Sequence, residues 1–161
     1  CKVKYIGNNG KKLGITNENI EISLGKDLDE NIEQSLIAGC ILCDANKPLK
    51  LVYTFKAKIM TLNYQEPLFK STSLVLYTLT GGIPVSIKKI YKYQNLQSNA
   101  EGAVFKPRVI PSNVSAEIIL TCIDKSICLD LFEKDKALGR FSLRRQNETV
   151  AIGIVTKLYK P

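Results

Sequence analysis

The sequence of 161 residues contains no histidine. Neither a Ser-His-Asp triad nor a Cys-His pair can therefore form. The carboxylates of Asp27 and Asp29 stand close together in the sequence, but they fall in a predicted loop and make a poor pair for general acid and base chemistry. We predict no catalytic residue in this chain.

The sequence also lacks a full set of zinc ligands. Cys40 and Cys43 have the spacing of half a zinc knuckle, but a tetrahedral site needs two more ligands and no histidine can supply them. Cys122 and Cys128 are separated by five residues, so they do not form a second knuckle. Because these cysteines have apolar neighbours, we predict buried structural thiols and no metal site.

Long hydrophobic runs are absent as well. No apolar stretch approaches the roughly 20 residues that span a bilayer, and the first ten residues do not read as a signal peptide. Five cysteines without framework spacing indicate the reduced thiols of a cytosolic protein, and we interpret the sequons at Asn113 and Asn147 as chance matches. We predict a soluble, cytoplasmic protein without membrane contact.

Positive charge is abundant, with 23 lysines and arginines against 15 acidic residues and a net charge of +8. Such an excess suits contact with a polyanion, because each neutralised phosphate releases condensed counterions. The same lysines could instead solvate strand faces and protect sheet edges. Charge alone leaves both interpretations open.

Short alternating runs between glycine, proline and asparagine clusters predict an all-β fold. In residues 51–62, for example, an apolar face runs through Tyr53, Phe55, Ala57 and Ile59. The predicted strands are residues 2–6, 19–24, 39–43, 51–62, 74–79, 83–93, 114–123 and 127–132, followed by one helical turn at 133–138 and a hairpin at 139–157. A phase slip after residue 87 predicts a β-bulge.

The strand count suits a six-stranded antiparallel barrel from about residue 50 onward. The preceding part, with three short strands, looks like the later half of another barrel. We therefore predict two domains, residues 1–48 and residues 49–161, of which the first is incomplete.

The closing hairpin at 139–157 combines an apolar face with a row of arginines. Phe141 and Leu143 alternate with polar residues, and a second alternation at Val150, Ile152 and Ile154 predicts that the same face continues on the return strand. Arginines 140 and 144 project from the opposite face and Arg145 stands at the turn. Their guanidinium forks suit carboxylates of a partner or phosphates of RNA.

This hairpin resembles the closing hairpin of the last domain of translational GTPases related to elongation factors Tu and 1-alpha, whose pattern is G-R-F-x-[LI]-R, a short turn, then T-[VI]-A-x-G. Residues 19–24 and 36–43 match the second-domain pattern of that family, and residues 55–59 match its F-x-A-x-[IV] strand. Lys106-Pro107-Arg108 matches its [KR]-P-[KR] segment. The resemblance covers nearly the whole chain and implies two translation-factor β-barrels, domain II in part and domain III.

Within the family, residues 82–90 (GIPVSIKKI) and 39–43 (GCILC) are similar to the HBS-type GTPases, which partner Pelota in no-go and nonstop mRNA decay. Elongation factor 1-alpha usually has a histidine near the first segment, and class-II release factors are more acidic there. The resemblance thus implies ribosome rescue. A release factor, or an elongation factor that delivers aminoacyl-tRNA, is the alternative within the family.

The GTP-binding motifs of that family are absent from this chain. Gly81-Gly82 is followed by no Lys-Ser or Lys-Thr of a phosphate loop, and Asn46-Lys47-Pro48 lacks the aspartate of the guanine reader. We expect GTP and Mg²⁺ to belong to a separate G domain of a longer parent, and this chain alone to be inactive.

The resemblance implies that the hairpin docks a tRNA-shaped protein partner of the Pelota type. The residues that would form this partner site are Gly139, Arg140, Phe141, Leu143, Arg144 and Arg145. For Phe141 and Leu143 we favour an alternative role in filling the barrel. The acidic Glu148 at the turn would repel phosphate, which favours a protein partner over tRNA.

A second basic segment interleaves lysines with tyrosines at residues 88–93. Such a pattern can stack bases and neutralise phosphates, and ribosomal RNA is the ligand that we expect for it. The residues of this RNA site are Lys88, Lys89, Tyr91, Lys92, Lys106 and Arg108. A lysine-guarded strand edge is the structural alternative, and a stand-alone cytosolic RNA-binding β-barrel is the alternative function.

Overall fold

The computed structural model describes residues 3–7, 21–24, 36, 39–44, 46–96 and 102–159. The chain divides into two compact units, residues 1–40 and 41–161. The predicted domain boundary at 48/49 stays a prediction, and Asp27 and Asp29 lie outside the described residues.

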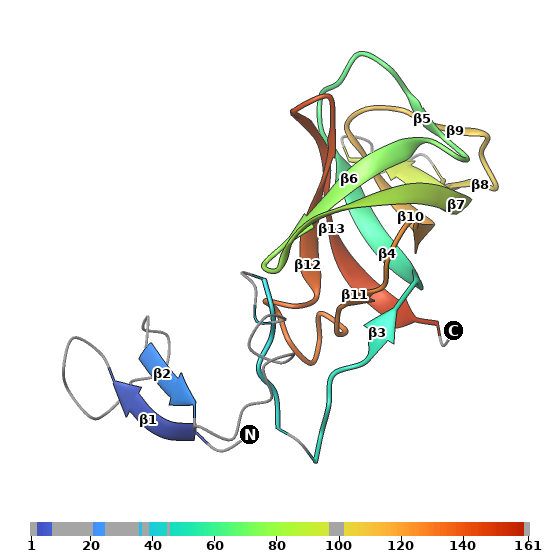
Figure 1. Ribbon diagram of the computed structural model, residues 1–161. Coiled ribbons are helices and arrows are strands. Elements are labelled where there is room, and N and C mark those ends of the chain that lie inside the picture. The colour runs from blue at the N-terminus through green and yellow to red at the C-terminus, as the bar shows by residue number, and fades with distance from the viewer. Residues whose placement is uncertain are drawn as a thin grey trace. The chain divides into compact units, whose positions relative to one another are not determined.

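In the first unit, β1 (Val3–Gly7) pairs antiparallel with β2 (Glu21–Leu24) (Figure 1). These strands confirm two of those predicted from the alternation. The strand predicted at 39–43 is wrong: these residues are in no strand, Leu42 is 60% exposed, and Gly39 has a φ of 98°. Apolar composition alone is a poor predictor of a strand here, because no strand among the described residues pairs with this segment.

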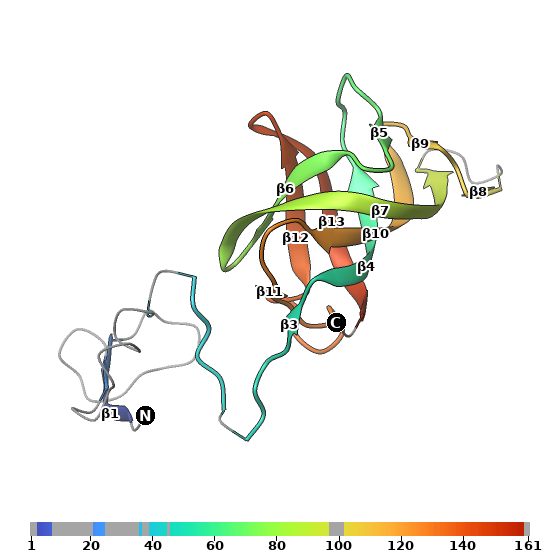
Figure 2. The same ribbon diagram turned by 45° about the vertical axis from the view of Figure 1, so that its right-hand side comes forward.

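The second unit is built on a closed antiparallel barrel. Its strands are β4 (Thr54–Thr61), β6 (Ser73–Thr78), β7 (Gly81–Asn95), β10 (Val114–Cys122), β12 (Arg140–Arg145) and β13 (Glu148–Leu158). They pair in the order β10-β4-β13-β12-β6-β7, and β7 returns to pair with β10, so the sheet closes on itself (Figures 1 and 2). The predicted six-stranded barrel is confirmed.

Short strands cover the two ends of the barrel. At one end, β5 (Leu68–Phe69) pairs with β9 (Val109–Ile110), and β8 (Val104–Phe105) pairs with the end of β7. Toward the other end, β3 (Leu51–Val52) pairs with β11 (Ile127–Cys128) (Figure 2). The strand predicted at 127–132 therefore stops after two residues. Residues 133–138 lie in hydrogen-bonded turns, and the bond from the amide of Gly139 to the carbonyl oxygen of Asp135 at 2.9 Å closes the single helical turn that was predicted.

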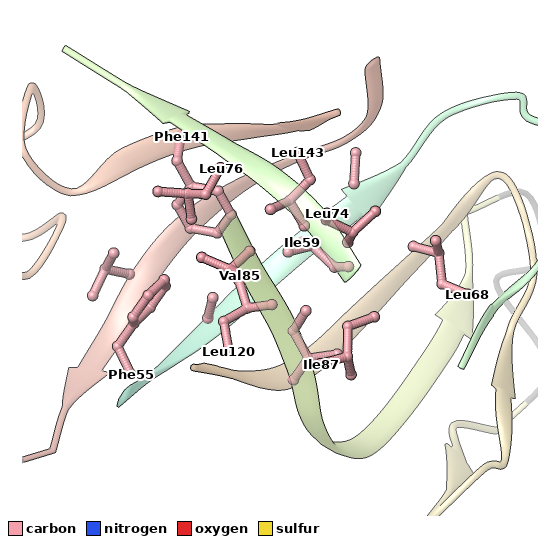
Figure 3. Packing of buried hydrophobic residues seen from close by; sticks show 14 of the residues in the cluster. Phe55, Ile59, Leu68, Leu74, Leu76, Val85, Ile87, Leu120, Phe141 and Leu143 are labelled. Atoms are coloured by element: carbon pink, nitrogen blue, oxygen red, sulfur yellow. The ribbon is translucent and has the colours of Figure 1, made fainter. Parts of the chain in front are cut away.

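The core fills the inside of the barrel with the inward residues of each strand (Figure 3). Phe55 and Phe141, from β4 and β12, meet edge to face with ring centroids 5.9 Å apart. Burial of each such side chain contributes roughly 1.5–3 kcal/mol. The predicted inward position of Tyr53 is wrong, since the chain bends there between β3 and β4 and leaves its side chain 47% exposed.

Strand β7 carries two irregularities that turn its side chains outward. The pairing with β10 shifts register twice, which leaves Lys88 and Tyr91 without an opposite residue. The bulge predicted from the phase slip after residue 87 is confirmed at Lys88. A second bulge, which the pattern did not predict, lies at Tyr91.

Candidate functional site

The turn of the β12–β13 hairpin is formed by Gln146 and Asn147, with φ angles of 46° and 68°. Both values lie in the left-handed region, as in the tight turns that join twisted antiparallel strands. Arg145 pairs with Glu148 on either side of the turn. The hairpin is therefore rigid and short, as its sequence pattern indicates.

A bulge on β13 changes which side chains of the hairpin face outward. Leu143 pairs with Ala151 while Arg144 pairs with Thr149, so Val150 is an extra residue. Val150 and Ala151 are both buried, and Ile152 is 43% exposed on the outer face. The predicted inward positions of Ile152 and Ile154 are thus wrong, because one extra residue reverses the alternation.

Three of the predicted partner residues lie in the wall of the barrel. Gly139, Phe141 and Leu143 are buried, and a Cβ added to Gly139 would lie 2.5 Å from the amide nitrogen of Phe132 and 2.8 Å from the carbonyl oxygen of Asp135. These positions hold the hairpin against the preceding loop and the core. The packing role that we favoured for Phe141 and Leu143 matches their burial.

The two arginines near the turn are bonded within the barrel. Arg144 donates a hydrogen bond from a terminal nitrogen to the carbonyl oxygen of Asn147 at 2.6 Å, and its guanidinium lies 5.4 Å from the ring centroid of Tyr77. Arg145 forms an ion pair with Glu66 at 2.6 Å. The Nε atom of Arg144 and one terminal nitrogen of Arg145 are buried without a hydrogen-bond partner among the described residues.

Arg140 differs from the other two because its side chain is exposed and makes no hydrogen bond or ion pair with the described residues. It borders a groove of about 820 Å³ on the outer wall of the barrel. We call four exposed hydrophobic side chains of this groove the apolar face: they are Met60, Tyr77, Leu79 and Ile152, exposed by 40%, 40%, 74% and 43%. Leu96, which is 49% exposed, also lines the groove.

The apolar face crosses four neighbouring strands. Ile152 on β13 pairs with Met60 on β4, and Ser142 on β12 pairs with both Ile152 and Tyr77 on β6. Sequence reasoning missed Met60, Leu79 and Ile152 as surface residues. Ile152 faces outward because of the bulge at Val150, and the alternating sequence pattern does not reveal that bulge.

A carboxylate neutralises Lys92 of the second basic segment together with Lys56 of strand β4. Glu117 on β10 pairs with Lys56 at 2.7 Å and with Lys92 at 3.0 Å. Hydrogen bonds from Lys56 and then Lys92 lower the pKa of Glu117, and the hydrogen bond with Glu117 raises the pKa of Lys56. Lys92 is therefore bonded within the barrel.

The ring of Tyr91 is covered by cations. The ammonium groups of Lys56 and Lys89 lie 4.8 Å and 4.7 Å from its centroid. Such cation–π contacts occupy the surface that a base would need for stacking. Of the predicted RNA residues, Lys88, Lys106 and Arg108 are exposed and make no hydrogen bond or ion pair through their side chains with the described residues.

Two of the cysteines that we expected to be buried lie at the surface. Cys40 and Cys43 are exposed, whereas Cys122 is buried and burial raises the pKa of its thiol to about 11. Within the described ranges, no group of three His, Cys, Asp or Glu side chains has the arrangement to hold a metal ion. No helix in that part of the chain has the length and hydropathy to cross a membrane.

Comparison with known proteins gives this barrel a context. Residues 54–156 match the sequence family described as GTP-eEF1A C-terminal domain-like. The chain is 30% identical over 126 residues to the eukaryotic peptide chain release factor GTP-binding subunit of Ogataea pini, covering 78% of this chain and 17% of that protein. It is 35% identical over 120 residues to the elongation factor 1 alpha-like protein of Schizosaccharomyces pombe, covering 74% and 19%.

Protein HBS1 of Drosophila melanogaster is 28% identical over 124 residues, covering 77% of this chain and 18% of that protein. A crystal structure of Sup35 complexed with GDP superposes with a TM-score of 0.82 at 22% identity, covering 99% of this chain and 38% of that one. The chain thus spans less than a fifth of the length of these curated relatives.

The closed sheet and its likeness to the C-terminal barrel domains of Sup35 define a β-barrel of the translation-factor type. The predicted all-β fold with a six-stranded antiparallel barrel is confirmed, and the incomplete first barrel stays a prediction. The match over most of the barrel identifies its family. The chain belongs to the GTP-eEF1A C-terminal domain-like family, that is, to the C-terminal domains of eEF1A-like translational GTPases.

Proposed function

We propose that the chain is the C-terminal, partner-binding and ribosome-binding part of a cytoplasmic translational GTPase that rescues stalled ribosomes in no-go and nonstop mRNA decay. Its protein partner is a tRNA-shaped factor of the Pelota type. The segments 82–90 and 39–43 support this branch, and a protein named HBS1 is among the relatives. Release-factor subunits are also among them, so that branch is the rival.

The observation that carries the proposal is the apolar face with Arg140 at its border. Contiguous exposed hydrophobic side chains on a rigid sheet are typical of protein interfaces, and aromatic residues, methionine and arginine are enriched in their centres. Aminoacyl-tRNA would need a row of phosphate-binding cations at this face, whereas the groove is lined by two, Lys58 and Arg140. Arg144 is instead used by Tyr77 and Asn147, and Glu148 adds a negative charge at the turn.

The barrel would act as a preformed docking platform. The hairpin is fixed by the buried Gly139 and Phe141, so the guanidinium of Arg140 is held on a rigid strand beside the apolar side chains. A partner would bury Ile152 and Met60 and place a carboxylate against Arg140. The binding of GTP and Mg²⁺ belongs, in this proposal, to the G domain of the parent, which would be oriented by the docked partner.

A pull-down with purified Pelota tests this site through Arg140→Glu and, separately, Ile152→Asp. We expect each variant to weaken binding by a factor of ten or more, about the effect of losing one central interface residue. The matched control is Arg108→Glu, which makes the same charge change at an exposed arginine directly before β9 and outside the apolar face. Equal binding by Arg140→Glu and the unchanged chain would rule out the site.

The same assay separates the branches of the family. A class-I termination factor captured in place of Pelota would assign the chain to the release-factor branch, and capture of aminoacyl-tRNA would assign it to the elongation branch. In either outcome the rescue function is wrong, although the apolar face can still be the docking site if Ile152→Asp abolishes the binding.

A further inference from the structure

Strands β5, β8 and β9 lie at one end of the barrel (Figures 1 and 2). Exposed aromatic and basic side chains come from these strands and their neighbouring residues. Two Phe-Lys dipeptides, Phe69-Lys70 and Phe105-Lys106, lie there, with Phe69 49% and Phe105 72% exposed. We call the whole set the basic-aromatic end: its residues are Phe69, Lys70, Lys88, Phe105, Lys106 and Arg108.

Backbone contacts bring these residues together from three separate parts of the sequence. The amide of Ser71 donates to the carbonyl of Ile87 at 2.8 Å, which brings Lys70 close to Lys88. The amide of Lys106 donates to the carbonyl of Tyr91 at 2.7 Å. Phe69 also pairs with Val109, the residue after Arg108. These contacts place all three segments next to one another at the same end of the barrel.

The distances within this end of the barrel suit a short stretch of chain-like ligand. Phe69 lies opposite Val109, and Phe105 stands four positions before Val109, which is a reach of at most about 14 Å. The backbones of Phe69 and Phe105 therefore lie within a few nucleotide spacings of each other. Each ring is followed directly by a lysine, so an aromatic surface and a cation repeat together, as a base and a phosphate repeat along a single strand.

The charges at this end are unopposed by the described carboxylates. Glu66 is paired with Arg145, and Glu117 is paired with Lys56 and Lys92. The side chains of Lys70, Lys88, Lys106 and Arg108 form no ion pair with the described residues. Tyr91 lies next to this end, and the ammonium groups of Lys56 and Lys89 compete with a base for the surface of its ring.

We propose that the basic-aromatic end binds single-stranded RNA, with Phe105 and Phe69 as stacking surfaces and Lys70, Lys88, Lys106 and Arg108 as phosphate contacts. This site is separate from the apolar face and goes beyond the proposed partner docking. RNA is favoured over a lipid surface because aromatic residues and cations alternate, whereas an interfacial membrane site gathers its apolar side chains on one face and its cations around it.

Fluorescence anisotropy of the 161-residue chain with a labelled oligouridine of about 12 nucleotides tests the site. We expect Phe105→Ala to weaken binding about tenfold, because one base loses its stacking surface. The triple variant Lys88→Ala, Lys106→Ala, Arg108→Ala should flatten the slope of log affinity against log salt by about 2, at roughly 0.7 for each lost phosphate contact.

Matched controls separate this site from general electrostatics. Ile123→Ala removes an exposed apolar side chain that lies in neither proposed site, and the triple variant Lys125→Ala, Lys134→Ala, Lys136→Ala removes the same charge from exposed lysines near β11. Both should leave the affinity within about twofold of the unchanged chain. Equal losses in the control and test triples would overturn the proposal, as would unchanged binding by Phe105→Ala.

Two further outcomes would also overturn it. A larger loss for Tyr91→Ala than for Phe105→Ala would move the site to the middle of β7. Co-sedimentation with vesicles of phosphatidylcholine and phosphatidylserine, combined with no binding of the oligouridine, would assign the end to a membrane surface instead. Far-UV circular dichroism of each variant distinguishes lost binding from lost folding.

Discussion

The β12–β13 hairpin and the middle of β7 are both rows of positive charge in the sequence, and they differ in how the barrel uses that charge. In the hairpin, Arg144 and Arg145 are bonded to Asn147, Tyr77 and Glu66, and Arg140 is left exposed beside apolar side chains. The hairpin therefore presents a single cation at the border of a hydrophobic surface.

In the middle of β7 the charge is shared with neighbouring strands instead. Lys92 is held by Glu117, and Lys89 covers Tyr91. The bulge at Lys88 and the turn at Lys106 leave these two residues exposed toward the end of the barrel. The comparison shows that not every residue of a basic run is available to a ligand. Only those basic side chains that make no hydrogen bond, ion pair or cation–π contact within the fold indicate a binding surface.

The largest expected effect tests how firmly the hairpin is fixed. Gly139→Ala should destabilise the barrel by about 3 kcal/mol, because its Cβ would meet the backbone of Phe132 and Asp135, which cannot move as a side-chain end can. Urea unfolding followed by circular dichroism measures this loss. Gly153→Ala should cost less, since its Cβ meets the ends of the Phe141 and Ile59 side chains.

Gly102→Ala is the control for this comparison, because a Cβ there would meet nothing within 4 Å. We expect its unfolding midpoint to match that of the unchanged chain. If Gly139→Ala were as stable as Gly102→Ala, the hairpin would not be clamped by the loop before it, and the rigid platform argued for Arg140 would be lost.

The second prediction separates the arginines within the hairpin. Arg144→Lys should lower the free energy of unfolding by about 1 kcal/mol, since an ammonium cannot both cover Tyr77 and keep the guanidinium geometry toward Asn147. Arg140→Lys should leave stability unchanged and weaken partner binding. The opposite pattern in paired unfolding and pull-down measurements would mean that Arg144, and not Arg140, contacts the partner.

Much of the fold could be predicted from the sequence because the barrel alternates residues strictly over its long strands. Phe55, Ala57 and Ile59 follow that alternation, and all three are buried. The predictions of side-chain direction that are wrong fall where alternation is interrupted, at the bend of Tyr53 and at the bulge that turns Ile152 outward. A bulge is set by pairing with another strand, so its position is not written in the local sequence.

The candidate sites could be predicted only in part, for a related reason. The arginines and lysines form recognisable runs in the sequence, but the carboxylates that pair with some of them, Glu66 and Glu117, are distant in the sequence. The exposed members could therefore not be separated from the bonded ones. Phe69 and Phe105 gave no signal because each stands in a two-residue strand, and only the pairing around β9 brings them to one end.

The smallest expected effect concerns Glu117, which neutralises the middle of β7. Glu117→Gln should lower stability at pH 7 by less than about 1 kcal/mol, since its carboxylate pairs with Lys56 and Lys92 at the surface. The pKa of Glu117 is lowered on folding, so its contribution is present above the ordinary value near 4.5 and is lost as the pH falls through the folded value. The stability difference between the variant and the unchanged chain should therefore disappear in acid, which unfolding curves at several pH values can measure.

The same variant frees Lys92 beside Phe105 and should bind oligouridine more tightly, with a steeper salt dependence. A difference in stability that persists in acid would show that Glu117 acts through packing. The proposal that its carboxylate neutralises the lysines around β7 would then be wrong.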